Sequence, residues 1–414
     1  MKKPKIDGER LWASLMDMGR IGATPGGGSG RIALTDLDRE ARDVFVDWSR
    51  EAGCAVRIDR MGNIFARRAG TDDARPPVMT GSHLDTQPLG GKFDGVYGVL
   101  AGLEVVRTLN DASIETEAPI DVVVWTDEEG VRFQSSMIAS GIFAGMYDLD
   151  HGLSSADSNG NTMGGELERI GYAGPEPVGG YPIDAFFEAH IEQGPLLESE
   201  GKSVGVVLGA QGKRCFRVTV EGEEGHAGTL PMDQRRDALL GAARMIDAVN
   251  HVAFSHQPRP VITVGAIRAR PNSPNTISGR TEFTIDSRHP DGDLLAAIGD
   301  DLRRVCAEIV DEAGLGLNVE QSTHRPTVTF DPSCITAIRE AAEERGISHR
   351  DIYSAAGHDA CNISLCAPTG MIFVPCENGI SHNEKENAKP EDLAAGCDVL
   401  LGAVLGRANR ENRR

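Results

Sequence analysis

Residues 121–129 read Asp121-Val122-Val123-Val124-Trp125-Thr126-Asp127-Glu128-Glu129, an apolar run followed at once by three carboxylates. Apolar side chains at consecutive positions are typical of a strand that is covered on both faces, as in an α/β sheet with helices on each side. Ligands of open α/β sheets bind beyond the carboxyl ends of the strands. The stretch therefore predicts an α/β fold and a candidate functional site directly after this strand.

Similar short apolar runs predict further strands of the same sheet. They are Val78–Ser82, Phe186–His190 and Met371–Pro375. Residues 95–109 predict a helix, because Val99, Leu103 and Val106 recur at helical spacing, and Asp94 is placed to cap it. This alternation of strands and amphipathic helices is the pattern of an α/β domain.

A different pattern occupies residues 213–325. Its predicted elements run strand, helix, strand, strand, helix, strand, in the order Cys215–Val220, Ala238–Val249, Val261–Ile267, Thr281–Asp286, Leu294–Glu312 and Leu317–Gln321. This order is the signature of a ferredoxin-like α+β module. We therefore predict a discontinuous α/β domain of residues 1–212 and 326–414, and an inserted domain of residues 213–325. Hinges are expected at Gly201–Gly212 and around Pro326.

The composition is that of a globular protein and argues against several kinds of partner. The 414 residues carry a formal net charge of −20, because 62 acidic residues outnumber 42 basic ones. So acidic a surface argues against nucleic acid and anionic membranes. The basic start, Met1–Ile6, is not followed by an uninterrupted apolar core and does not predict a secretory signal. Eight scattered cysteines without a C-x-x-C pair predict reduced thiols and a cytoplasmic location.

Histidines and carboxylates follow the predicted strands of the larger domain. They are His83, Asp85, Asp94, Asp127-Glu128-Glu129, His190, Glu192 and His382. Any one of them could be an ordinary surface or core residue, and the acidic triple could be a solvated turn. Placement at one sheet edge would nevertheless bring them together. Imidazole and carboxylate donors suit zinc, manganese, cobalt or nickel rather than calcium, and a pair of such ions would lie about 3.5–4 Å apart.

Five segments of the sequence carry a family resemblance. They are Gly81-Ser82-His83-Leu84-Asp85-Thr86-Gln87-Pro88, Gly90-Gly91-Lys92-Phe93-Asp94-Gly95, Thr126-Asp127-Glu128-Glu129-Gly130, His190-Ile191-Glu192-Gln193-Gly194-Pro195 and Gly379-Ile380-Ser381-His382-Asn383. In this order they resemble the carbamoylase branch of the two-metal peptidase-like amidohydrolases. That branch contains N-carbamoyl-L-amino acid hydrolases, β-ureidopropionases and allantoate amidohydrolases. The resemblance implies a mixed-sheet two-metal hydrolase domain with an inserted lid or dimerisation domain.

The resemblance also implies roles for the residues that follow the strands. It assigns two divalent ions, zinc or manganese with cobalt or nickel as alternatives, to two overlapping groups: His83, Asp94 and His190 for one, and Asp94, Glu129 and His382 for the other. Asp94 would bridge the ions. Glu128 would be the general base that passes a proton to the leaving nitrogen. Asp85 would orient His83 from behind.

Further residues implied by the resemblance would bind the substrate. His226, in Gly225-His226-Ala227-Gly228, would be the oxyanion donor, and in relatives such a histidine reaches the active site of a partner subunit. A homodimer through the inserted domain is therefore implied. Asn275 and Arg288 would grip the substrate carboxylate, for which the planar fork of arginine is suited. Gln193 and the backbone of Gly357 would be additional contacts.

The implied reaction is metal-dependent hydrolysis of the carbamoyl C–N bond of an N-carbamoyl amino acid, giving the amino acid, ammonia and carbon dioxide. Cys215 and Cys376-Glu377-Asn378 depart from the usual residues of the family. They leave an α-amino acid, β-alanine and allantoate open as the amine part, although Gln87-Pro88 and the Gly90-Gly91-Lys92 run favour carbamoylases and β-ureidopropionases. An aminoacylase or dipeptidase on the same fold and an inactive binding protein are further alternatives.

The glycine-rich run Pro25-Gly26-Gly27-Gly28-Ser29-Gly30 predicts no phosphate site, because it lacks the Lys-Ser/Thr of a P-loop and follows no predicted strand. We expect it to be a flexible loop near the substrate. The sequence also lacks the G-x-S-x-G and H-E-x-x-H motifs, which argues against serine hydrolases and zincins.

Overall fold

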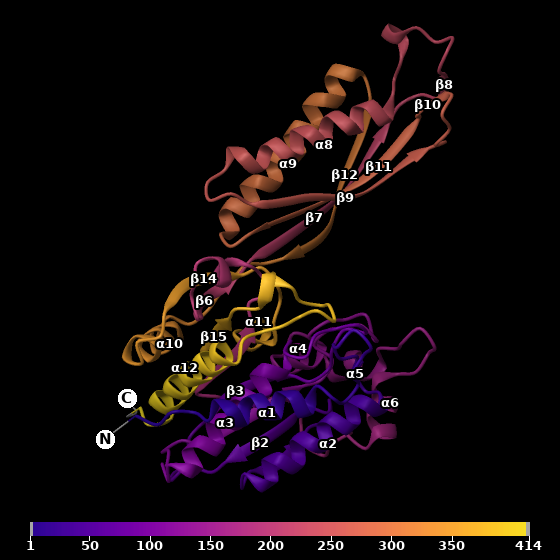
Figure 1. Cartoon of the computed structure of the whole chain (residues 1–414). Helices are drawn as coiled ribbons and strands as arrows, with labels where there is room; N and C mark the ends of the chain where they lie inside the picture. The colour runs from indigo at the N-terminus through magenta and orange to yellow at the C-terminus, as the bar shows by residue number, and fades with distance from the viewer. Residues whose placement is uncertain (1–2, 411–414) are drawn as a thin grey trace. The chain divides into compact units, whose positions relative to one another are not determined.

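A computed structural model describes residues 3–410, which divide into two compact units (Figure 1). The first unit comprises the chain up to Gly209 and from Thr329 onward, and the second unit is Ala210–Val328. Each unit has its own sheet, and each is described by itself.

The first unit is organised around a nine-stranded mixed sheet. In sheet order its strands are β1 (Ala55–Ile58), β2 (Ile64–Arg68), β4 (Ile120–Trp125), β3 (Val78–His83), β5 (Ala185–Ile191), β15 (Thr369–Val374), β6 (Val204–Ala210) and β13 (Val328–Thr329), with β14 (His349–Ser354) paired to β6. Strand β3 pairs in parallel with β4 and β5, and β15 in parallel with β5. Strands β2 and β6 run antiparallel to β4 and β15. The parallel centre brings four carboxyl ends to one edge of the sheet.

The four central strands β3, β4, β5 and β15 are buried at every position. Consecutive apolar residues predict such burial, because helices cover both faces of the strands. The predicted α/β fold with a mixed sheet is therefore confirmed.

Helices of the first unit pack on this sheet and on one another. They are α1 (Gly8–Met18), α2 (Asp36–Glu51), α3 (Val96–Asp111), α4 (Ile138–Phe143), α5 (Leu149–Ser154), α6 (Met163–Ile170), α7 (Leu196–Ser199), α10 (Pro332–Glu344), α11 (Asp359–Ile363) and α12 (Pro390–Ala408), with the 3₁₀ turn η2 (Glu377–Gly379). Helices α3 and α12 contact each other and strands β3 and β5, whereas α2 contacts β1 and β2. Among residues 3–410, no helix has the length and apolar character needed to cross a membrane.

The second unit contains a four-stranded antiparallel sheet in the order β12-β7-β11-β9. Its elements are β7 (Gly212–Glu221), β8 (Gly225–His226), η1 (Met232–Gln234), α8 (Ala238–Ser255), β9 (Val261–Arg270), β10 (Thr276–Ile277), β11 (Arg280–His289), α9 (Gly292–Ala313) and β12 (Gly316–Arg325). Helices α8 and α9 pack on this sheet around a core that includes Phe216, Phe283 and Leu302. The short strands β8 and β10 form a separate two-stranded ribbon.

One predicted hinge of the inserted segment is a strand. Val204–Ala210, within the expected hinge Gly201–Gly212, is β6, and its Val207 lies opposite Met371 of β15. Its valines are buried in the core of the first unit. Gly205 within this strand permits close packing, since a Cβ there would lie 2.8 Å from a side-chain atom of Ile352.

Candidate metal centre

The ends of β3 and β5 carry the first group of candidate ligands. His83 is the last residue of β3, His190 is the penultimate residue of β5, and Asp94 lies in the loop before α3. Nε2 of His190 lies 3.1 Å and Nε2 of His83 lies 3.9 Å from Oδ1 of Asp94. All three side chains are buried, and their ligand atoms lie within 4.8 Å of one another. This spacing is small enough for one metal ion to contact all three.

A second group shares the carboxylate of Asp94. Nε2 of His382 lies 3.3 Å from Oδ2 of Asp94 and 3.4 Å from Oε2 of Glu129. His382 lies in the loop between β15 and α12, and its side chain is half exposed. Because the two oxygens of Asp94 face the two groups, this carboxylate is placed to bridge two ions.

Backbone carbonyls hold both buried histidines in the tautomer that binds a metal. Nδ1 of His83 lies 2.9 Å from the carbonyl oxygen of Asp85, and Nδ1 of His190 lies 2.9 Å from that of Ile191. A carbonyl only accepts, so each Nδ1 carries a proton, and the lone pair of the neutral ring is on Nε2. Moreover, Oε1 of Glu129 is buried and has no hydrogen-bond partner among the described residues. This donor set fits divalent ions such as zinc or manganese.

Charge and burial determine where protons bind when no ion is present. Burial lowers the pKa of His190, but the hydrogen bond to Asp94 and the charges of Asp94 and Glu188 together outweigh burial and raise the pKa to about 9. The hydrogen bond to Asp94 also raises the pKa of His382 to about 9. Although burial raises the pKa of Asp94, its bonds to these two histidines hold that pKa well below the usual range. Protons therefore occupy the positions that a metal would take and must leave when it binds.

Glu128 lies beside the first group. Its Oε2 is 3.6 Å from Nε2 of His83, and the side chain is buried. Burial, and next the charge of Asp359, raises the pKa of Glu128 well above its usual range. A carboxyl group with a raised pKa at this position can accept and return a proton near neutral pH.

Asp85 supports Glu128 and Glu129 more directly than it supports His83. Its two carboxylate oxygens accept the backbone N–H groups of Glu128 and Glu129, at 3.3 and 3.2 Å. The nearer carboxylate oxygen lies 3.8 Å from Nδ1 of His83, which is beyond hydrogen-bonding distance. In this structure the group of Asp85 within hydrogen-bonding distance of the His83 ring is the backbone carbonyl, at 2.9 Å.

Asp94 does not cap helix α3, contrary to the sequence prediction. The N-cap residue is Gly95, with φ 68°, and no side chain caps this helix. A Cβ at Gly95 would lie 2.3 Å from Cε1 of His83, so the chain can pass the imidazole here only as glycine. The carboxylate of Asp94 is turned toward the histidines and is not available for the helix end.

Two residues that the sequence did not single out hold Asp94 in place. The carboxylate of Glu386 accepts the N–H groups of Phe93 and Asp94, at 2.9 and 3.1 Å. The hydroxyl of Ser381 lies 3.0 Å from both Oδ2 of Asp94 and Oε2 of Glu386. Ser381 lies within one of the segments that carry the family resemblance. No local sequence pattern marks Glu386, because the backbone groups that it accepts, those of Phe93 and Asp94, are nearly 300 residues away in the sequence.

The other predicted residues of the first unit lie in three different settings. Gln193 is at the centre, where its Nε2 donates to Oδ2 of Asp94 at 2.9 Å. Glu192 is turned away, because its carboxylate accepts the N–H groups of Leu196 and Leu197 in helix α7, both at 2.8 Å. Gly357 is exposed, just before helix α11.

A further cluster of Glu188, His190 and His358 lies behind the first group. The two oxygens of Glu188 accept the hydroxyl of Ser82 at 2.6 Å and the N–H of Ala360 at 2.9 Å. Burial lowers the pKa of His358 well below its usual value, so this ring is neutral. It packs edge-on against His190, with ring centroids 4.6 Å apart. We interpret Glu188 and His358 as residues that hold the ring of His190 in position.

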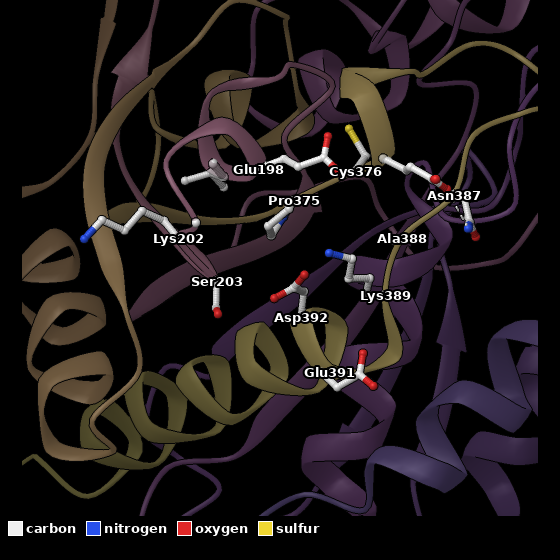
Figure 2. A pocket seen from close by; sticks show the side chains of 13 residues that line it. Glu198, Lys202, Ser203, Pro375, Cys376, Asn387, Ala388, Lys389, Glu391 and Asp392 are labelled. Carbon is white, nitrogen blue, oxygen red and sulfur yellow. Dashed lines mark hydrogen bonds between the residues drawn. The ribbon is translucent and has the colours of Figure 1, made fainter.

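A cavity of about 550 Å³ adjoins the loop that carries His382 (Figure 2). Residues 375–377 and 387–389, the two ends of that loop, line it together with Glu198 and Lys202. None of the five candidate metal ligands lines it. The cavity is therefore distinct from the metal centre.

In the second unit, His226 and Asn275 lie close together, whereas Arg288 is distant. His226 is in β8, which pairs with β10, the strand that follows Asn275 (Figure 1). Arg288 is near the far end of β11, where its Nε donates to Oδ1 of Asp286 at 2.9 Å. From Arg280, the start of β11, to Arg288 the strand rises roughly 26 Å at about 3.3 Å per residue. A small molecule cannot contact both ends within one copy of this unit.

Known proteins resemble the chain over nearly its whole length. An N-carbamoyl-L-amino-acid amidohydrolase of Rhizobium meliloti is 47% identical over 404 residues, which cover 98% of this chain and 97% of that protein. An allantoate amidohydrolase of Escherichia coli (strain K12) is 34% identical over 385 residues, covering 92% and 93%. A solved amidase of the hydantoinase/carbamoylase family from Burkholderia multivorans has a TM-score of 0.95 and 56% identity, covering 98% and 99%.

The sequence profile of one family also matches the segments that carry the candidate ligands. Residues 79–406 match the profile of peptidase family M20/M25/M40. The match begins in β3 and ends in α12, so it includes both groups of candidate ligands. The chain belongs to peptidase family M20/M25/M40, and its relatives within that family include named amidohydrolases.

Proposed function

We propose that the protein hydrolyses the carbamoyl C–N bond of an N-carbamoyl-L-amino acid or N-carbamoyl-β-alanine, giving the amino acid, ammonia and carbon dioxide. The observation that carries this proposal is the carboxylate of Asp94, whose oxygens face two groups of metal-binding side chains with Glu128 beside them. The similarity to the amidohydrolase of Rhizobium meliloti supports a ureido substrate.

The proposed ligands are those of the two groups that share Asp94, and Glu128 is the proposed proton carrier. A pair of divalent ions bound there would polarise the scissile carbonyl and make a water molecule acidic. Glu128 takes the proton of the attacking water and delivers it to the leaving nitrogen. Burial raises the pKa of Glu128 well above its usual range, which favours uptake of the proton by this carboxylate. The bond from its N–H to Asp85 fixes the backbone from which this side chain extends.

His226 is the proposed oxyanion donor. Its Nδ1 accepts the N–H of Gly228 at 3.0 Å, so the proton of the neutral ring is on Nε2. An Nε2–H group is the donor that a developing oxyanion requires. Asn275 and Arg288 are proposed to bind the substrate carboxylate, with Gln193 and the backbone of Gly357 as further contacts.

We also propose that the second unit is a ferredoxin-like lid and dimerisation domain and that the protein is a homodimer. The sheet order β12-β7-β11-β9 with two packed helices supports the ferredoxin-like assignment. Within one copy, His226 and Arg288 lie at opposite ends of the second unit. A small ureido acid can therefore contact both only when they come from different copies. A symmetric dimer provides two such composite sites.

Two further proposals follow from the chemistry of the side chains. The mixture of imidazole and carboxylate ligands supports zinc or manganese, with cobalt or nickel as alternatives. The buried cysteines Cys54, Cys306 and Cys397 are free thiols, which supports a cytoplasmic location.

Release of ammonia tests the proposed reaction. Enzyme stripped with a chelator and reloaded with zinc, manganese, cobalt or nickel should be incubated with N-carbamoyl-L-amino acids, N-carbamoyl-β-alanine and allantoate. We expect ammonia and free amine in equal amounts from the carbamoyl substrates, and only after reloading. Free amine without ammonia from N-acyl amino acids or dipeptides would instead identify an aminoacylase or dipeptidase. No product from any substrate, with both ions bound, would identify an inactive binding protein.

Allantoate is the second candidate substrate. The similarity to the allantoate amidohydrolase of Escherichia coli favours it. A higher kcat/KM for allantoate than for every carbamoyl amino acid would select this alternative.

A further inference from the structure

The glycine-rich residues 24–30, for which the sequence predicts a flexible loop near the substrate, form a hydrogen-bonded turn. The N–H of Gly27 donates to the carbonyl of Thr24 at 3.0 Å, and the N–H of Thr24 donates to the carbonyl of Gly28 at 3.1 Å. The N–H of Gly28 also donates to the hydroxyl of Thr24 at 3.1 Å. We call residues 24–30 the glycine-rich turn. Its own hydrogen bonds give it a defined shape.

On one side, the glycine-rich turn is bonded to the loop that leads to Asp94. Ser29 and Gly90 exchange two backbone hydrogen bonds, at 3.0 and 3.1 Å. Arg31 follows the turn and is fully buried, and its Nε donates to the carbonyl of Leu84 at 3.1 Å. The turn and the loop with Asp94 are thus joined at two places.

On its other side, the glycine-rich turn contacts the loop that carries His382. The N–H of Gly26 donates to Oε1 of Glu384, two residues beyond His382, at 2.9 Å. A Cβ at Gly28 would lie 2.7 Å from Cα of Glu384 and 2.1 Å from the carbonyl oxygen of Gly90. The turn therefore fills the space between the two loops so closely that no side chain fits at Gly28.

The candidate ligands differ in what fixes their positions. His83 and His190 belong to central strands, so the ladder of the sheet holds them. His382 lies in a loop, half exposed, with a left-handed backbone conformation (φ 53°). Its position depends on the groups that the loop packs against, and the glycine-rich turn is one of them.

We propose that the glycine-rich turn is a positioning element that sets the separation between Asp94 and His382, and thereby the affinity for the ion held by Glu129 and His382. The inference rests on the two-ion site proposed above. Disturbing the turn will weaken binding of this ion more than binding of the ion held by His83 and His190, because those two histidines belong to strands β3 and β5. A turn that only stabilised the fold would affect both ions alike.

Titration of the chelator-stripped, full-length protein with Mn²⁺ in a calorimeter tests this inference. The variants Glu384→Ala and Gly28→Ala disturb the turn in two ways, by removing a hydrogen-bond acceptor and by adding a Cβ. Glu384→Gln removes the charge but keeps an oxygen that accepts the N–H of Gly26. Gly406→Ala in α12, where a Cβ has no neighbour within 4 Å, is the matched control. His382→Gln identifies which binding event belongs to the ion in question.

We expect Glu384→Ala and Gly28→Ala to weaken this binding event about 10- to 100-fold, as is typical when a residue that supports a metal ligand is lost. The other event should weaken much less, and Glu384→Gln should keep most of the wild-type affinity. Wild-type affinities in both disturbed variants would refute the inference, as would equal weakening of the two events. Equal loss of affinity in Glu384→Gln and Glu384→Ala would also refute it, because the charge alone would then matter. If the wild-type protein bound a single ion, the proposed two-ion site itself would fail.

Discussion

Competition between a proton and a metal at His190 gives metal binding a pH dependence that the structure allows us to calculate. Burial lowers the pKa of this imidazole, but the hydrogen bond to Asp94 and the charges of Asp94 and Glu188 raise it to about 9, so the protonated ring predominates at all lower pH values. The ring must lose this proton before Nε2 can bind a metal. At pH 7, two units below the pKa, about one ring in a hundred is neutral, which weakens metal binding by about 3 kcal/mol relative to alkaline solution. The affinity should therefore rise with pH and level off above about pH 9.

Calorimetry with the variant His382→Gln isolates the ion for which His190 is the proposed ligand. Titrations with Mn²⁺ at pH 6, 7 and 8 should show the dissociation constant falling about tenfold per pH unit for each proton displaced. Repeating them in two buffers with different protonation enthalpies should show at least one proton released per ion. His251→Gln, which removes an exposed histidine of α8, should leave this slope unchanged. A constant affinity between pH 6 and 8, without proton release, would show that His190 is already neutral and would refute the reasoning.

Three further predictions concern the base, the composite site and the first ion. Glu128→Gln should keep both ions but lower kcat for ammonia release by about 100-fold or more; an unchanged kcat would exclude Glu128 as the proton carrier. His226→Ala and Arg288→Ala should each be inactive alone, but coexpressed they should form mixed dimers in which one of two sites is intact. Failure to recover activity would argue that each copy works alone. Gly95→Ala should not bind the ion assigned to His83, Asp94 and His190 in calorimetry, because the added Cβ would lie 2.3 Å from the imidazole of His83. Gly145→Ala, with a similar positive φ but open space, should bind metal like the wild type.

Local sequence predicted the central strands because burial on both faces requires apolar residues in succession. The predicted strand Val78–Ser82 and the observed β3, Val78–His83, differ by one residue. The segment expected as a hinge, Gly201–Gly212, contains strand β6, in which Gly205 packs closely against Ile352. A glycine in the sequence can indicate either backbone flexibility or close packing of two segments. Only its neighbours in the folded structure distinguish the two.

For the candidate site, the sequence pattern identified the residues that follow the strands. It did not identify the hydrogen bonds that hold their side chains in position. Asp94 was expected to cap a helix, because aspartate is a preferred residue directly before the first turn of a helix. The sequence pattern of a capping aspartate is the same as that of an aspartate that faces two histidines. The contact of Glu386 with the Asp94 backbone joins positions 292 residues apart, so it depends on how two loops close over each other. The separation of His226 from Arg288 likewise depends on strand β11 running its full length.

The neighbouring positions of β6 and β13 in the large sheet have a consequence for how this architecture can change. The chain departs for the second unit after β6 and returns through β13, and the N–H of Phe330 donates to the carbonyl of Leu208 at 3.0 Å. The two crossings are therefore adjacent, and a short turn could replace everything between them without altering the order of the remaining strands. The inserted unit could in this sense be exchanged as a single piece while the order of strands in the nine-stranded sheet stays the same.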